Sequence, residues 1–528
     1  MLTFVVFPSA TAAQLMDGEL RVTVRDSAGL ATGANVELIG RSPEFHASAQ
    51  TDAQGEARLA RLPLGVHLLR VTRDGFRPFT RQVEIRSAVP QTVEASLQLA
   101  EVVTQITVEE TAPVLDGSQP RLIIRAGRDQ LAEAMGTTLG RSTIDVVTTM
   151  PGWLLEANAV LHPRGSEYDT QYVVDGMPVY DNRSLAFAPA FENSEFETVN
   201  VMTAGVPAEY GRRLGGVIAL DSRRAGNPGF NFETNVQASS YDTYIASLSP
   251  QYRGDKTSFS AGIQGGHTQR YLDPPSLENF TNQANSGGGH LRLDRQLTDR
   301  DRLSFYLRSN RTGFQVPNDL EQQAAGQRQG RKANETAGQV HYQKTITSAT
   351  LLSLRGMVRD LTAGLESNAL STPVYVDQDR GFREGVLIGD ISHQTERHTL
   401  KFGGDVRLNA IRERFAVAEP DELPELDLEF SGNRRSTEAA LYIQDHIRLG
   451  NFAASVGLRF DHYSLIIDDQ AVSPRVALSY YFPKAGLQIR AAYDRMFQPP
   501  ASENILFSSA AAGLDLDEVE DSIPVPPS

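Results

Sequence analysis

The 528-residue sequence contains no cysteine. This absence excludes disulfide bonds, zinc sites built on thiolates and a cysteine nucleophile together. Only one tryptophan is present, whereas there are 43 glycines, 23 phenylalanines and 16 tyrosines, and this balance favours turns and strands over packed helices. Positive charge is scarce too. The 50 Lys and Arg residues are scattered along the chain and are outnumbered by 65 Asp and Glu residues, so the net charge is −15. We therefore expect no nucleic-acid partner.

Long apolar runs are also missing. No stretch reaches the roughly 18 uninterrupted apolar residues from which a membrane-spanning helix is recognised. A membrane β-barrel stays open as a fold, because its alternating strands leave only a weak hydropathy signal. The chain is too long for one ordinary domain, and we expect two to four units.

Motifs for catalysis and cofactor binding do not occur either. We find no Gly-x-Ser-x-Gly motif, phosphate-binding loop or dinucleotide-binding glycine pattern in a strand–loop–helix context. His393 and Glu396 have a zinc-peptidase spacing, but residues i and i+3 of a strand point to opposite faces and cannot bind one metal together. The sequence therefore predicts no enzyme, no metal site and no cofactor.

The N-terminal residues 1–17 combine a short apolar stretch with small residues, and a signal peptidase would cleave suitably after Ala12 or Ala13. No Lys or Arg precedes the apolar part, so the basic start of an export signal is missing. We interpret residues 1–17 as the remnant of a signal peptide whose true start lies upstream. The alternative is a frayed tail.

Residues 18–99 alternate between apolar and polar side chains, as in Leu20, Val22 and Val24. Short strands separated by turn sequences such as "DSAGLATGA" and "TDAQGEA" predict a small antiparallel β-sandwich. The run "TDAQGEARLARLPLGVHLLRVTRDGF" resembles the carboxypeptidase regulatory-like domain, which has an Ig-like fold. That name implies no peptidase here, and a sandwich without any binding function remains an alternative.

Residues 100–118 form a β-prone, acidic segment without an obvious partner strand. Such a segment is either a linker or an extended peptide that adds itself as a strand to the sheet edge of another protein. Residues 119–225 change pattern and predict a compact α+β unit. We expect a short helix around 141–150, strands at "QYVVDG" and "FETVNVMTA", and then a glycine-rich hairpin, "AEYGRRLGGVIAL".

Residues 226–528 alternate almost throughout. In "NFAASVGLRFDHY", Phe452, Val456, Leu458 and Phe460 share one face, whereas Arg459 lies on the other. Strands of roughly nine to eleven residues that are apolar on one side and charged on the other, joined by alternating tight turns and long loops, predict an antiparallel transmembrane β-barrel with a polar lumen. A soluble all-β protein with one wet face is the alternative.

The order of these units resembles the TonB-dependent outer-membrane receptors, particularly those with an N-terminal regulatory-like domain. "RGSEYDTQYVVDGMPV" resembles the first motif of the family's plug domain, and "ETVNVMTAGVPAEYGRRLGGVIAL" resembles the second. The resemblance covers about residues 18–528. It implies a mainly β fold with an Ig-like sandwich at 18–99, a TonB-contacting segment in 100–118, a plug at 119–225 and a barrel at 226–528.

The resemblance also implies roles for residues. The segment that would contact TonB is Glu101, Val102, Val103, Thr104, Gln105, Ile106, Thr107 and Val108. The plug-motif residues are Arg164, Gly165, Asp175, Gly176, Tyr210, Gly211, Gly215 and Gly216. In the family, the arginine at the position of Arg164 pairs with barrel carboxylates. The usual second arginine is replaced by Ala204, so we expect the two-arginine contact between plug and barrel to be at most half present.

Glycines in these motifs have a physical reason. The turn Asp175-Gly176 needs positive φ angles, which glycine adopts at little cost. We expect Gly211, Gly215 and Gly216 to let the plug backbone pack closely against the barrel wall.

Plugged barrels have 22 strands, whereas the residues after the plug supply about fourteen. The chain ends in "EVEDSIPVPPS" and not on a strand with a terminal aromatic residue. We therefore expect a C-terminally truncated chain with an incompletely closed wall, whose last paired strand lies near Leu487–Met496.

By resemblance, the protein takes up a scarce ligand, such as a siderophore or a glycan, across the Gram-negative outer membrane, with the sandwich in the periplasm. Its partners would be TonB, outer-membrane lipid and an extracellular ligand that the sequence does not identify. One alternative is an adhesion or surface-assembly protein of the same architecture. A secreted, soluble glycan-binding β-protein is the other.

Overall fold

The computed structural model describes residues 18–499 apart from 27–28, 31–32, 42–43, 63–64, 86–88, 99–119, 135–138, 156–160, 164–169, 180–190, 226–228, 255, 373–374, 419–427 and 466–467. The expected signal remnant, the whole segment 100–118 and the C-terminal tail lie outside the described residues. Within the described part of the chain, no helix is long and apolar enough to cross a membrane.

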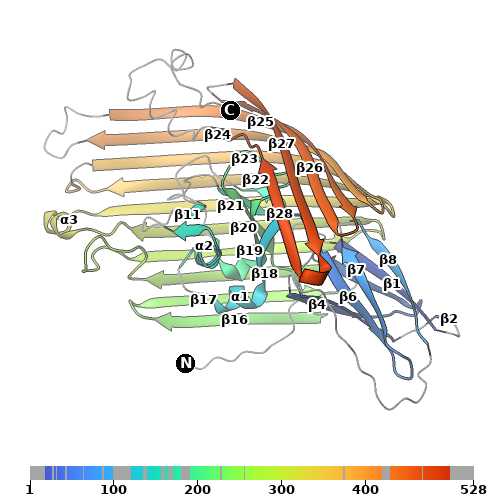
Figure 1. The fold of residues 1–528 in the computed structure, drawn as a ribbon. Helices are drawn as coiled ribbons and strands as arrows, with labels where there is room; N and C mark the ends of the chain where they lie inside the picture. The colour runs from blue at the N-terminus through green and yellow to red at the C-terminus, as the bar shows by residue number, and fades with distance from the viewer. Residues whose placement is uncertain are drawn as a thin grey trace.

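A 13-stranded antiparallel sheet, which we call the wall, forms the largest part of the described chain (Figure 1). Its strands follow one another in chain order, each paired with the next. They are β16 (Gly229–Ser239), β17 (Thr243–Arg253), β18 (Thr257–Thr268), β19 (Ala284–Gln296), β20 (Asp301–Gln315), β21 (Gln329–Thr347), β22 (Thr350–Ser367), β23 (Tyr375–Gln394), β24 (His398–Ala418), β25 (Leu428–Leu449), β26 (Phe452–Ser464), β27 (Asp468–Phe482) and β28 (Leu487–Asp494).

The alternation expected from the sequence sets the two faces of the wall. In β26, Val456, Leu458 and Phe460 are exposed on the outer face, whereas Arg459 and Asp461 are buried on the inner face. Successive side chains of a strand point to opposite sides, so an alternating sequence yields one apolar and one charged face. The prediction of strands that are apolar outside and charged inside is confirmed.

The expected strand lengths are wrong for the middle of the wall. Strands β21 to β25 contain 18 to 22 residues and not nine to eleven. Tight turns such as 297–300 and 450–451 lie at one end of the wall, which we call the turn end, and long loops such as 269–283 and 316–328 lie at the loop end. The extra residues extend the strands at the loop end.

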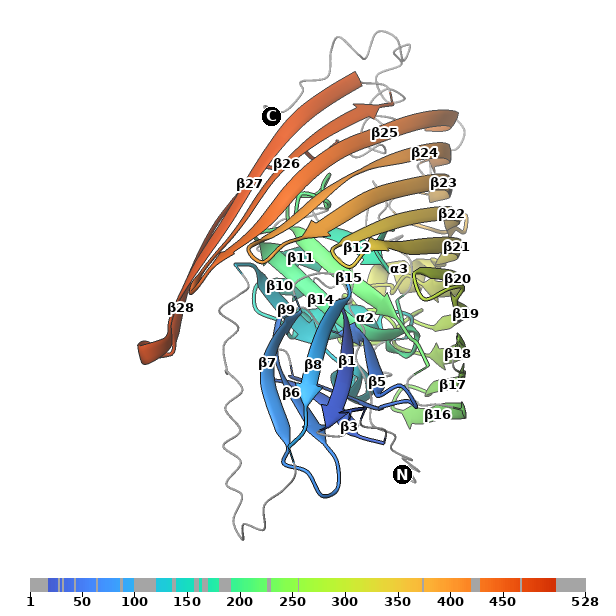
Figure 2. The ribbon, with the colours of Figure 1, turned by 90° about the vertical axis from the view of Figure 1, so that its right-hand side faces the viewer.

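The wall is open along one side. In the described residues, β16 pairs only with β17 and β28 pairs only with β27, and Figure 2 shows the sheet as a curved, unclosed surface. The last paired strand, Leu487–Asp494, lies where the sequence predicted it.

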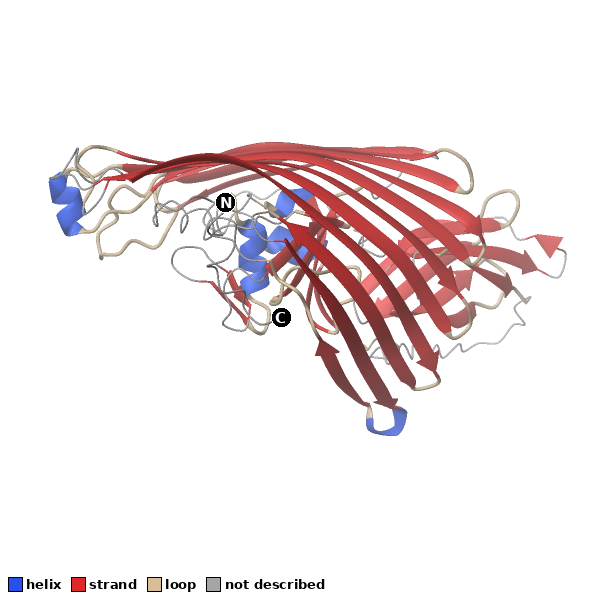
Figure 3. Ribbon diagram, turned by 90° about the horizontal axis from the view of Figure 1, so that it is seen from above, coloured by secondary structure: helices blue, strands red, loops and turns tan. Residues whose placement is uncertain are grey.

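The plug lies on the concave side of the wall (Figure 3). Its sheet has the order β13-β12-β15-β14-β9. The strands and helices of the plug are β9 (Leu122–Ala126), α1 (Arg128–Glu133), α2 (Ser142–Thr148), β10 (Trp153–Leu155), β11 (Leu161–Pro163), β12 (Thr170–Val174), β13 (Met177–Pro178), a 3₁₀ helix η2 (Asn193–Glu195), β14 (Phe196–Ala204) and β15 (Gly216–Ser222).

Most plug elements agree with the sequence, but the glycine-rich hairpin does not form. The helix expected around 141–150 is α2, and β12 and β14 lie where strands were expected. The second half of the supposed hairpin, β15, pairs in parallel with β12 and antiparallel with β14, and residues 205–215 form a loop. Apolar residues including Val174, Phe191, Phe196 and Leu220 make the plug core.

The N-terminal sandwich consists of two four-stranded sheets. Its strands are β1 (Gly18–Asp26), β2 (Gly29–Leu30), β3 (Asn35–Arg41), β4 (Glu44–Gln50), β5 (Glu56–Leu62), β6 (Gly65–Thr72), β7 (Phe79–Ile85) and β8 (Gln91–Ser96). Leu20, Val36, Leu38 and Leu69 pack between the sheets and are fully buried. The sandwich is not purely antiparallel as expected, because β1 and β8 pair in parallel.

The sandwich contacts the turn end of the wall through polar groups. Glu19 binds Arg58 of the sandwich at 2.5 Å and Arg302 of the wall at 3.4 Å. Arg21 donates to the carbonyl of Asp299 at 3.2 Å, and Glu84 forms an ion pair with Arg448. Burial acts to raise the pKa of the Glu19 carboxyl, but Arg58 and Arg302 outweigh it and hold that pKa below its ordinary value.

We therefore predict that the sandwich undocks in acid. Because the pKa of Glu19 lies below the ordinary 4.5, its contribution is complete above pH 4.5 and is lost as the pH falls through the lowered pKa. Since the native chain has no cysteine, spin labels at Ser48→Cys and Ser348→Cys would report the distance between sandwich and wall. We expect this distance distribution to broaden in acid and, with Glu19→Gln, already at neutral pH. An unchanged distribution in both cases would contradict a docking role for Glu19.

Candidate functional site: the contact between plug and wall

The loop 205–215 brings the second plug motif against the wall. Gly211 lies so close to β26 that a Cβ atom built on it would be 2.5 Å from Nε of Arg459. Only glycine leaves room for the guanidinium there. The expected role of Gly211, close approach of the plug backbone to the wall, agrees with this geometry.

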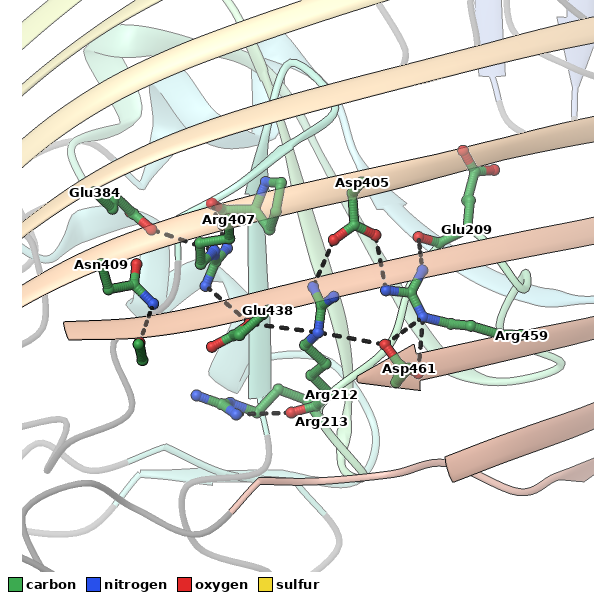
Figure 4. Close-up of polar contacts among 12 residues, drawn as sticks. Glu209, Arg212, Arg213, Glu384, Asp405, Arg407, Asn409, Glu438, Arg459 and Asp461 are labelled. Carbon is green, nitrogen blue, oxygen red and sulfur yellow. Dashed lines mark hydrogen bonds and ion pairs between the residues drawn. The ribbon is translucent and has the colours of Figure 1, made fainter. Parts of the chain in front are cut away.

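Arg212 follows directly and has a positive φ of 67°, which turns its side chain into the wall. Its guanidinium binds Asp405 at 2.7 Å, and lies 3.3 Å from both Glu438 and Asp461 (Figure 4). Only 3% of the Arg212 side chain is exposed. The plug therefore places one buried cation among three wall carboxylates on three adjacent strands.

Arg459 of the wall reaches in the opposite direction. It binds Asp405 at 2.8 Å and Asp461 at 2.9 Å, and donates to the backbone carbonyl of Glu209 at 3.0 Å (Figure 4). This guanidinium therefore holds the acidic cluster and the plug loop at the same time.

Two further wall residues bind the backbone of the same loop. Arg475 donates to the carbonyl of Pro207 at 2.6 Å. Asp494 accepts from the N–H of Gly205 at 2.8 Å. Backbone groups in a chain segment without strand partners need such bonds when they are buried, and here the wall supplies them.

The plug touches the wall with a second buried charge, Glu195 of η2. Its carboxylate accepts from Arg308 at 3.2 Å, from Asn310 at 2.7 Å and from Gln264 at 3.0 Å. Burial raises the pKa of the Glu195 carboxyl, and Arg308 opposes that effect.

The two plug charges are connected by the ion-pair chain, a row of alternating charges with one residue on each of six wall strands. The steps are Arg308 to Glu335 (2.6 Å), Glu335 to Arg359 (2.7 Å), Arg359 to Glu384 (3.0 Å), Glu384 to Arg407 (3.3 Å) and Arg407 to Glu438 (4.0 Å). Glu195 joins the first residue and Arg212 joins the last. All these side chains are at most 4% exposed.

The first plug motif contacts the wall at its turn. Asp175 and Gly176 have φ angles of 50° and 80°, as expected for this tight turn between β12 and β13. Asp175 binds Arg292 at 2.7 Å, and the carbonyl of Gly176 accepts from Arg355 at 3.2 Å. A Cβ atom built on Gly176 would lie 2.3 Å from Nη1 of Arg355. The absence of a side chain at Gly176 therefore leaves room for the Arg355 guanidinium.

The other motif residues differ in their surroundings. Tyr210 is buried, and Gly215 is partly exposed. The close contact of Gly216 is with the carbonyl of Met202 inside the plug, at 2.7 Å from a built Cβ, so its expected contact with the wall is wrong. Arg164, Gly165 and Glu101–Val108 lie outside the described residues.

Sequence reasoning missed the charges that carry this contact. Because Ala204 replaces an arginine, we expected the plug–barrel contact to be at most half present, yet Arg212 supplies a buried cation from the same motif. The signal was available in "YGRRLGG", where arginines stand between glycines in a region with little room. Nothing in the sequence marks Glu195.

At the loop end, buried amides hold the loops together. Asn318, which is fully buried, donates to the carbonyl of Gln327 at 2.9 Å, and Gln327 accepts from the N–H of Thr372 at 2.8 Å. Thr281 donates to the carbonyl of Val316 at 3.1 Å. Loops 269–283 and 316–328 and residue Thr372 therefore form one ordered rim over this part of the wall.

Two parts of the chain match known protein families. Residues 205–519, more than half of the chain, match the family described as "TonB dependent receptor-like, beta-barrel". Residues 19–98 match the carboxypeptidase regulatory-like domain. The chain is 26% identical over 215 residues to the TonB-dependent transporter Oar of Myxococcus xanthus, a match that covers 39% of this chain and 20% of that protein.

Solved structures share the fold. The unliganded ferric citrate transporter FecA superposes with a TM-score of 0.60 at 14% identity, over 75% of this chain and 66% of that one. The siderophore receptor PiuA from Acinetobacter baumannii gives 0.54 at 13% identity, over 69% and 63%. The chain thus spans a fifth of the curated relative and just under two thirds of these structures.

We predict that Arg212→Met loosens the plug without unfolding the wall. Removing one partner of a buried ion pair costs about 3–5 kcal/mol, because the remaining charges stay buried. Limited proteolysis should cut the plug faster, while the wall keeps its resistance to the protease. Arg414→Met removes an exposed arginine paired with Asp377 and should leave proteolysis unchanged. Equal cleavage rates in both variants would show that Arg212 does not hold the plug.

We also predict that alanine substitutions at two nearby glycines, Gly211 and Gly215, change the stability of plug docking by different amounts. Gly211→Ala forces the Arg459 guanidinium to move and should destabilise plug docking by about 1–3 kcal/mol. Gly215→Ala lies in a partly exposed position and should change stability by about 0.5 kcal/mol or less. Hydrogen exchange of the 205–215 backbone measures both. Protection that is equally retained in the two variants would refute the close approach of Gly211.

Proposed function

Because the chain belongs to the TonB dependent receptor-like beta-barrel family, we propose that it takes up a scarce ligand across the outer membrane by energised displacement of its plug. The ligand binds at the loop end, which faces outward, and the sandwich lies in the periplasm at the turn end. TonB pairs with the segment 101–108 as an added strand and pulls on the plug.

The observation that supports this proposal is the polar character of the contact between plug and wall. The charged and backbone groups around Arg212 and Glu195 are buried, but all of them can be hydrated when water enters. A buried ion pair contributes little net stability compared with apolar packing, because desolvation offsets the attraction. Such a contact holds one defined position and still separates at a lower cost than an apolar core of the same area.

The position of the segment that TonB would pull, residues 101–108, supports the same proposal. Residues 99–119 connect the last strand of the sandwich, β8, to the first strand of the plug, β9. The sandwich is bound to the turn end of the wall through Glu19 and Glu84. A force applied between these two bodies therefore acts on the plug, while the sandwich stays anchored to the wall.

The family alone does not identify the ligand. FecA is a ferric citrate transporter, and PiuA is a siderophore receptor. We propose an iron-chelate or glycan-like ligand, bound over the ordered rim that Asn318 and Gln327 hold together.

Strand pairing with TonB gives the sharpest test. Val103→Pro removes a backbone donor and should lower the affinity of a peptide of residues 95–115 for the C-terminal domain of TonB at least about tenfold. Val103→Ala keeps the donor and serves as the control. Unchanged binding of the proline peptide would place the TonB contact elsewhere.

Transport and adhesion are separated in cells. With ferric citrate, a siderophore extract or a glycan as the limiting nutrient, uptake predicts growth that requires both TonB and an intact Val103. An adhesion or surface-assembly role predicts growth that is independent of both, with a loss of cell–cell or surface attachment when the gene is deleted.

A further inference from the structure

On the outer face of the wall, the band of exposed apolar side chains ends abruptly on the side toward the loop end. Val358 on β22, Leu387 on β23, Leu408 on β24 and Leu441 on β25 are 58–69% exposed on this face. Apolar side chains exposed in such a continuous band face lipid in a membrane barrel. Toward the loop end, the same face of the same strands continues with charged residues.

Three arginines begin this charged region, and we call them the outer arginine triad: Arg383, Arg412 and Arg435. Strand register places Arg383 opposite Ala410 and Ala410 opposite Arg435, so two of the arginines flank one alanine. Arg412 follows two residues later on the same face of β24. With neighbouring strands about 4.8 Å apart, the Cα atoms of the triad lie within roughly 10 Å of each other.

Small residues lie next to the arginines. Ala410 separates Arg383 from Arg435, and Gly381 lies opposite Arg412 on β23. A Cβ on Gly381 would be 3.2 Å from Nη2 of Arg412, so this guanidinium lies flat across the glycine. The triad therefore surrounds one small side chain, that of Ala410, and we call this position the notch.

The three arginines around the notch outnumber the carboxylates that pair with them. Arg383 binds Asp360 at 2.6 Å, and Arg412 lies 3.7 Å from Asp379. Among the described residues, Arg435 has no carboxylate partner. The side chains of Arg383 and Arg412 are 74% and 60% exposed, so their guanidinium groups keep donors free for a further anion.

We propose that the outer arginine triad binds the phosphate of an anionic lipid in the outer leaflet. Guanidinium groups bind phosphate oxygens through paired, charge-assisted hydrogen bonds. Basic clusters at the edge of the apolar region recognise lipid headgroups. Directly below the notch, Leu387, Leu408 and Leu441 offer an apolar surface for the acyl chains. That continuity favours a lipid over a free phosphate ion.

This inference rests on the proposed membrane placement and not on the transport role. The triad lies on the outer face of β23 to β25, whereas the ion-pair chain lies on the inner face, which Arg212 of the plug contacts. A variant of the triad therefore leaves the plug contact intact.

The test uses native mass spectrometry of the detergent-extracted protein, incubated with diphosphorylated lipid A or with the same lipid after removal of its phosphates. The test variant is Arg383→Gln/Arg412→Gln/Arg435→Gln. The control variant, Arg295→Gln/Lys344→Gln/Arg397→Gln, removes three cations at the turn end of the wall. Outer-membrane fractionation and unchanged far-UV circular dichroism show that each variant is membrane-inserted and folded.

We expect the parent and the control variant to retain phosphorylated lipid A, and the triad variant to lose at least about tenfold in affinity. Dephosphorylated lipid A should bind weakly to all three proteins, and excess inorganic phosphate should not displace the phosphorylated lipid. Equal retention by parent and triad variant would overturn the proposal. Complete displacement by inorganic phosphate would reassign the site to a free ion. A folded triad variant with unaltered uptake would separate this site from the proposed function.

Discussion

Arg359 binds a glutamate on each neighbouring strand, and this arrangement is repeated across the inner face of the wall. A strand with one face in lipid can carry charge only on its other face, where each buried charge needs an opposite charge within reach. Adjacent strands are about 4.8 Å apart, so an opposite charge on the next strand lies within reach. The ion-pair chain satisfies this condition for six strands, and Glu195 and Arg212 of the plug bind its two ends. The plug is therefore part of the charge balance of the wall.

This constraint also explains the backbone of the second plug motif. A loop that is buried against charged side chains cannot form sheet bonds, so its carbonyls accept from Arg459 and Arg475. The arginines need space, which Gly211 provides for one of them and Gly176 provides for Arg355 in the first motif. The plug glycines thus accommodate wall arginines, whereas Gly216 accommodates the plug's own strand.

The alternation of single strands was sufficient to predict both faces of the wall, because a period of two depends on local sequence alone. The partners of Arg212 were not predictable in this way, since Asp405, Glu438 and Asp461 follow it by about two hundred residues or more and are brought together only by strand register. The predicted strand lengths were wrong for a different reason. The expected nine to eleven residues correspond to the lipid crossing, and beyond it outward positions such as Arg412 and Arg414 are polar, so the apolar pattern ends before the strand does. The hairpin expected at 208–220 does not form, because β15 pairs with β12 and β14.

The long strands at the loop end have a geometric consequence. The 22 residues of β25 extend about 70 Å, which corresponds to a height of about 55 Å at the usual barrel tilt, whereas the apolar band of such a barrel is about 25 Å tall. Even with the turn end just below the bilayer, the rim of this barrel stands well clear of the lipid surface. With the loop end facing outward, as proposed above, a solute approaching the cell would meet this protein above the layer of lipid headgroups, before it reached the membrane itself.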